Sequence, residues 1–110
     1  MYAIEKGSQK INGELIPTFQ REIISGDTDL IVAAGTNGYK GSCARKAGGR
    51  SFLSILNLEG DFHFGPIMDD DGNMTGIEIA CCGDGGLNAL LKALDFSRQV
   101  LNEQKCGFND

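Results

Sequence analysis

The spacing of apolar residues changes near Leu87, and this change constrains the fold more than any other feature of the sequence. From there on, apolar residues recur at intervals of three and four, as on one face of an α-helix. They are Leu87, Leu90, Leu91, Leu94 and Leu101, flanked by Ala89, Ala93, Phe96 and Val100. Asp84 is placed to cap the helix start, and Gly107 follows its end. We therefore predict a C-terminal helix of about 20 residues, roughly 30 Å long.

The residues before this helix are typical of β-strands. Residues 30–34 are continuously apolar, which predicts a strand that is buried on both faces. Asn12 and Gly13 predict a first hairpin, because both tolerate the positive φ of a type I′ turn. Pro17 lacks a backbone donor, so the strand that contains it should lie at an edge or end there.

A second hairpin is predicted between residues 62–64 and 77–81. Both segments alternate apolar and more polar positions, so each predicts a strand with one buried face. Residues 69–73, Asp-Asp-Asp-Gly-Asn, supply the turn. An EF-hand calcium loop that began at residue 69 would need Gly at its sixth position and Glu at its twelfth, where Met74 and Ala80 stand. The hairpin turn is therefore favoured over a calcium site.

These elements predict an α+β fold: an antiparallel sheet of about five or six strands, with the C-terminal helix packed on one face. The 110 residues, 41% of them hydrophobic, fit a single domain over residues 1–110. One helix about 10 Å wide cannot cover both faces of such a sheet. Because several strands carry apolar residues on both phases, we expect a homo-oligomer, most simply a two-fold dimer.

Composition excludes several classes of protein. The net charge of −5 argues against general nucleic-acid binding. The longest apolar run, residues 30–34, falls far short of the roughly 20 residues of a membrane helix. The first residues lack a basic start followed by an apolar stretch, so we expect a cytoplasmic protein.

The cysteines indicate neither a metal site nor a disulfide framework. Cys43, Cys81, Cys82 and Cys106 form no Cys-x-x-Cys pair, and His63 is the single histidine. We expect four reduced thiols, at least two of them in the core. Neither a metal nor another cofactor is required by this sequence.

The charge is distributed unevenly, and its basic part coincides with a Gly-rich stretch. Residues 1–50 hold seven Lys or Arg against five Asp or Glu, whereas residues 51–110 hold three against ten. No acid occurs between Asp29 and Glu59. The loop at residues 36–50 combines backbone donors with positive charges, which suits a phosphate or a carboxylate. Its candidate binding residues are Thr36, Asn37, Lys40, Ser42, Arg45, Lys46 and Arg50.

The Gly-rich loop matches no known phosphate-binding motif. Its Lys-Gly-Ser order differs from the Gly-Lys-Ser of a Walker A loop, and its glycines do not fit G-x-G-x-x-G. A solvated surface loop is the alternative to an anion site. Residues 83–86, Gly-Asp-Gly-Gly, could hold an anion at a helix start, but the carboxylate of Asp84 favours capping there.

The sequence carries no recognisable catalytic signature. We therefore predict a non-enzymatic binding or accessory module that contacts an anionic ligand or an acidic protein partner through the loop. One alternative is a small enzyme acting on an anionic substrate, with His63 or a cysteine such as Cys43 as its reactive group. A third possibility is a subunit whose only role is self-assembly. Convergence of the histidine, a cysteine and the loop in one cleft would favour the enzyme.

Overall fold

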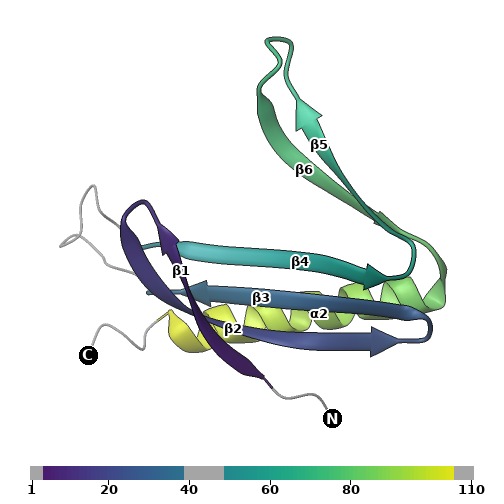
Figure 1. Ribbon diagram of the computed structural model, residues 1–110, viewed down its shortest axis with the longest axis horizontal. Helices are drawn as coiled ribbons and strands as arrows, with labels where there is room; N and C mark the ends of the chain where they lie inside the picture. Colours follow the sequence, from purple (N-terminus) through teal and green to yellow (C-terminus); the bar gives the residue numbers. More distant parts are fainter. Residues whose placement is uncertain (1–3, 39–48, 106–110) are drawn as a thin grey trace.

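The computed structural model of this protein describes residues 4–38 and 49–105. The described residues form six antiparallel strands and one long helix, which confirms the α+β class (Figure 1). The elements are β1 (Glu5–Ile11), β2 (Glu14–Ser25), β3 (Thr28–Thr36), β4 (Ser51–Glu59), β5 (Phe62–Met68), β6 (Met74–Cys81) and α2 (Gly83–Gln104). The strands divide into a four-stranded sheet in the order β1-β2-β3-β4 and a two-stranded sheet, β5-β6.

Local chemistry sets the course of the four-stranded sheet. Asn12 and Gly13 have φ values of 50° and 84° and join β1 to β2, which confirms the first hairpin. β2 does not end at Pro17, which pairs with Ser8 of β1. The β2-β3 pairing begins only at Phe19, so the missing donor of Pro17 interrupts no bond to β3.

The core lies between β3 and the helix, which covers one face of the sheet (Figure 1). β3 is an interior strand, as the apolar run predicted, and Leu30, Val32, Ala33 and Ala34 are buried. The predicted burial on both faces is confirmed only in part, because α2 covers one face and Ile31, on the other face, is half-buried. The core cluster around β3 also contains Ile23, Phe62, Ala89, Ala93, Phe96 and Val100. The fully buried alanines of α2 let the helix approach the sheet closely.

The two ends of α2 are fixed to the two ends of β3. At the C-terminal end, the Gln104 side chain accepts a buried hydrogen bond of 3.1 Å from the backbone N–H of Thr36. At the N-terminal end, a Cβ at Gly85 would lie 2.7 Å from the Ser25 carbonyl oxygen, beside the β2-β3 turn. The helix therefore runs the length of β3, and its 22 residues agree with the predicted length.

The predicted cap of this helix is wrong. Cys82 is the N-cap residue and makes no side-chain capping bond, whereas Asp84 lies inside the first turn. Gly83 adopts a φ of 81°, which turns the chain directly from β6 into the helix. The carboxylate of Asp84 can still interact favourably with the positive end of the helix dipole. In the described part of the chain, no helix is both long and apolar enough to cross a membrane.

β5, β6 and the turn between them, residues 62–81, form a projection that we call the arm. Figure 1 shows the arm leaving the end of the sheet and extending well beyond it. Its strands pair with each other, as the second hairpin predicted. The prediction that each strand has a buried face is wrong, because Phe62 alone is buried and the residues beyond it are exposed or half-buried.

Candidate functional site

The described residues of the predicted anion site form a hydrogen-bonded neck at the base of the Gly-rich loop. We define the neck as residues 36–38 and 49–51. The Asn37 side-chain oxygen accepts a bond of 2.7 Å from the Arg50 N–H, and the Asn37 N–H donates to the Arg50 carbonyl at 3.2 Å. The Thr36 hydroxyl donates to the same carbonyl at 2.9 Å. These groups hold the two ends of the loop together.

The polar side chains of the neck therefore form their hydrogen bonds within the protein. Thr36 and Asn37 are buried, and the Arg50 guanidinium donates to the Ile11 carbonyl and lies 4.0 Å from a carboxylate oxygen of Glu14. Three of the seven predicted binding residues are thus brought together, in a structural role. The other four, Lys40, Ser42, Arg45 and Lys46, lie outside the described residues, so the anion site itself stays a prediction.

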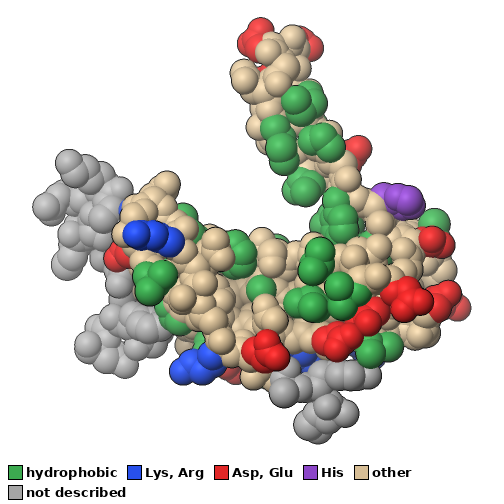
Figure 2. All heavy atoms as spheres, viewed as in Figure 1, with side chains coloured by type: hydrophobic (Ala, Val, Ile, Leu, Met, Phe, Trp, Pro, Cys, Tyr) green, Lys and Arg blue, Asp and Glu red, His purple; other side chains and the backbone are tan. Residues whose placement is uncertain are grey.

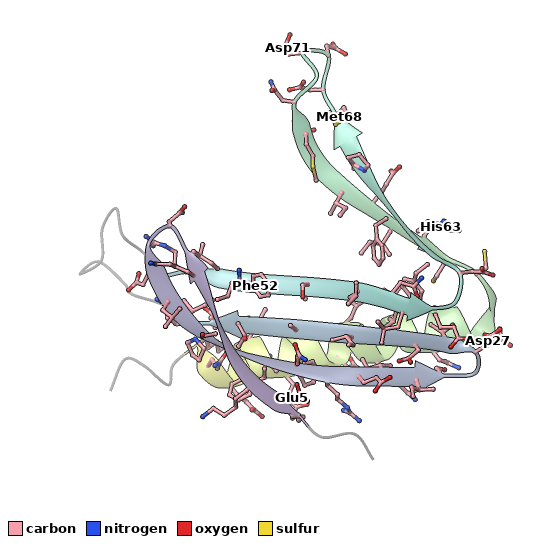
Figure 3. The ribbon with its side chains drawn as sticks, viewed as in Figure 1. Glu5, Asp27, Phe52, His63, Met68 and Asp71 are labelled. Carbon is pink, nitrogen blue, oxygen red and sulfur yellow. The ribbon has the colours of Figure 1, made fainter. Side chains whose placement is uncertain are left out.

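The groups proposed for the enzyme alternative do not converge among the described residues. His63 lies at the base of the arm, whereas Phe52, next to the neck, lies at the opposite end of β4 (Figure 3). The hollow beside His63 measures about 410 Å³, and the residues that line it, 63–65 and 78–80, include no Ser or Cys. Cys43 lies outside the described residues.

The two described cysteines carry free thiols at the base of the arm. Cys81 is half-buried and packs against the core, whereas Cys82 is exposed. Cys106 lies outside the described residues, so the expectation of two core cysteines is not settled. Within residues 4–38 and 49–105, no three His, Cys, Asp or Glu side chains gather closely enough to hold a metal ion.

The aspartate-rich segment forms the tip of the arm and serves as a turn. A side-chain oxygen of Asp69 accepts hydrogen bonds of 2.9 Å from the N–H groups of Asp71 and Asn73. Gly72 has a φ of 84°, which closes the turn. The carboxylate of Asp69 is thus used by the backbone, as expected for a hairpin and not for a calcium loop.

The sheet face opposite the helix is polar on one side and apolar on the other. On the polar side, a hydrogen bond to Asp29 raises the pKa of the Glu22 carboxyl above its ordinary value, and desolvation and the charge of Asp29 act in the same direction. On the apolar side, Ile31 and Leu56 are paired neighbours in β3 and β4. Figure 2 shows this division, with hydrophobic side chains near the arm and acidic ones along the adjoining margin.

One face of the arm carries apolar side chains at its paired positions. The register pairs Phe64 with Ile79 and Pro66 with Ile77, and cross-strand partners share a face. The opposite face of the ribbon carries the charged or titratable side chains His63 and Glu78. Ile77 is 58% exposed. Sequence reasoning found the alternation but did not foresee that this face lies open.

A small pocket between β2 and α2 is a further candidate. It measures about 230 Å³ and is lined by Ile4, Phe19, Arg21, Phe96, Gln99, Val100, Glu103 and Gln104. The Nε atom of Arg21 is buried there without a hydrogen bond. The carboxylate of Glu103 would compete with an anionic ligand for this guanidinium, and the volume is below the roughly 300 Å³ at which ligand pockets begin.

In comparisons with known proteins, no protein family, no curated protein and no solved structure matches this chain.

Proposed function

We propose that this protein is a non-enzymatic binding module, and that its contact surface is the apolar face of the arm. The observation that carries this proposal is the exposure of that face on a projecting two-stranded ribbon. An isolated hairpin is at best marginally stable in water, so packing against a further surface would stabilise the arm. Exposed apolar surface of this kind is typical of protein interaction sites.

The enzyme alternative has less support. An enzyme of this kind needs its reactive group and its substrate-binding residues in one cleft. His63 and the neck lie at opposite ends of β4, and the hollow beside His63 is lined by no Ser or Cys that could serve as a nucleophile. A binding role requires no such convergence.

Substitution of the arm face is expected to release the protein from its assembly. In a clarified cell extract, the wild-type protein should elute in size-exclusion chromatography above the mass of one chain, 11.8 kDa. Ile77→Lys places a charge on the apolar face and should shift the protein to that mass. Ile67→Lys is the matched control, because Ile67 is 43% exposed on the opposite face of the same arm. Identical elution of wild type and both variants would contradict the proposal.

The Gly-rich loop is a second candidate contact, supported by the absence of any acid between Asp29 and Glu59. We expect the triple variant Lys40→Ser, Arg45→Ser, Lys46→Ser to lose binding of a polyanion. The binding is measured at low salt, because at physiological ionic strength exposed charges are screened over a Debye length of roughly 8 Å. Arg50 is left intact, since its bonds at the neck hold the fold. A thermal-shift screen of nucleotides, phosphorylated sugars and polyanions tests this, and an equal shift of wild type and variant would exclude the loop as an anion site.

A further inference from the structure

We infer that the surface covering the arm is a second copy of this chain, and that two copies bind reciprocally, each laying its arm on the sheet of the other. This inference rests on the proposed function and names its partner. It requires a receiving surface on the sheet, a geometry that closes between two copies, and a sufficient contact area.

The receiving surface is the apolar half of the open sheet face, which we call the strip. The strip comprises Ile31 of β3 together with Phe52, Ser54 and Leu56 of β4, and Ala33, the partner of Ser54, is already buried within the chain. Leu56 is 55% exposed, on the face that α2 does not cover. Figure 2 shows hydrophobic side chains in this part of the sheet, next to the base of the arm. The arm face and the strip are thus two neighbouring parts of one angled apolar surface.

The arm face and the strip belong to the same chain, and a contact between two such surfaces favours a two-fold dimer. In such a dimer, a contact of the first copy's arm with the second copy's strip is repeated with the roles exchanged. The lengths are compatible, because residues 64–68 of β5 and residues 52–56 of β4 each extend roughly 17 Å. A different protein would need two apolar surfaces set at the same angle to cover both parts.

The contact area also favours a second copy. One face of a two-stranded ribbon of this length presents roughly 400 Å² of accessible surface, so a single arm laid on another surface buries about 800 Å² in total, below the ~1,200 Å² at which stable interfaces begin. Reciprocal contacts double the total to about 1,600 Å², the size of an ordinary specific interface. The arm alone is too small to bind stably, whereas two arms used together are large enough.

The outer edge of the four-stranded sheet also favours a second copy of this chain as the partner. β4 is the last strand of its sheet, and residues 51–58 contain no charged residue and no proline. Edge strands of proteins that stay monomeric are usually protected by such residues. An arm laid over β4 would hinder the pairing of another strand with this edge.

The test is the mass of the purified protein by sedimentation equilibrium across micromolar concentrations. The wild type should have twice the 11.8 kDa of one chain. Ile77→Lys on the arm and Leu56→Asp on the strip should each weaken the dimer roughly 100-fold or more, because each substitution occurs twice in a symmetric dimer. Circular dichroism of each variant verifies that the helix and the sheet are retained.

Two matched controls use the same residue types on the opposite faces. Ile67→Lys lies on the other face of the arm, and Leu53→Asp lies on the helix-side face of β4, where Leu53 is 53% exposed. Both should remain dimeric. Loss of the dimer in the controls to the same degree as in the test variants would overturn the assignment of these faces.

Mixing the two test variants examines reciprocity. A mixed dimer of Ile77→Lys and Leu56→Asp holds one unaltered contact and one in which Lys faces Asp, so the mixture should dimerise more strongly than either variant alone. No gain on mixing would overturn the arm-to-strip contact. A monomeric wild type would overturn the inference, and an arm-dependent complex in cell extract would then assign the surface to a different protein. Absence of both assemblies would contradict the proposed function as well.

Discussion

The Leu30→Ala variant is expected to lose about 2–5 kcal/mol of its free energy of unfolding, because the substitution leaves a cavity where β3 meets the helix. Leu30 is fully buried and belongs to the core cluster that includes Phe62 and Phe96. A domain of this size typically has a stability of about 5–15 kcal/mol, so the loss is a large part of the total. The melting temperature should fall by roughly 4–8 °C for each kcal/mol.

Leu53→Ala is the matched control for this cavity. Leu53 also lies in a strand of the four-stranded sheet, but half of its side chain is exposed. The same truncation there should cost less than about 1 kcal/mol, since little packing is lost. Urea denaturation at one fixed protein concentration measures both variants, because the stability of the proposed dimer would depend on concentration. Equal losses for the two variants would mean that the core is not centred on β3.

The elements that the sequence predicts well are those determined by neighbouring residues. The helical spacing from Leu87 onward, the continuous apolar run of β3 and the Asn12-Gly13 turn each constrain a short segment without reference to the rest of the chain. The structure confirms all three. The misplaced helix cap has a local cause as well, since Gly83 takes up the turn and Cys82 becomes the last extended residue.

The arm shows what spacing alone cannot predict. Alternation along β5 and β6 determines which side chains share a face, but not which surface covers that face. In a single chain the pair Phe64 and Ile79 is left partly exposed, because the arm extends away from the sheet. For the Gly-rich loop, the sequence suggests a binding role for residues whose hydrogen bonds are in fact made within the chain. Thr36 and Asn37 look like ligand-binding residues in the sequence, and their hydrogen-bond partners come from residues 50, 51 and 104, which spacing does not identify.

The close approach of β2 to β3 beside Pro17 gives the second large effect, and it depends on a residue that the sequence does not mark. Gly35 pairs with Phe52 on one side. On the other side, a Cβ at Gly35 would lie 2.8 Å from the Cα atom of Thr18 and closer still to the Pro17 carbonyl oxygen. Both neighbours are backbone atoms held by the pairing of β1 with β2, so neither can move aside alone. Glycine is required here for lack of space, not for an unusual φ.

Gly35→Ala is therefore expected to cost about 3 kcal/mol or more, at or above the upper end of ordinary overpacking, because part of the sheet must shift to admit one methyl group. Gly65→Ala is the control: it too substitutes a strand glycine, but its added Cβ would meet nothing nearer than Glu78 Cγ at 3.7 Å. That variant should match the wild type or gain a few tenths of a kcal/mol, since glycine is a poor strand residue. Denaturation curves give the two free energies, and amide chemical shifts should change around Thr18 in the first variant alone. If Gly35→Ala unfolded at the wild-type denaturant concentration, β2 could not pass as close to β3 as the structure places it.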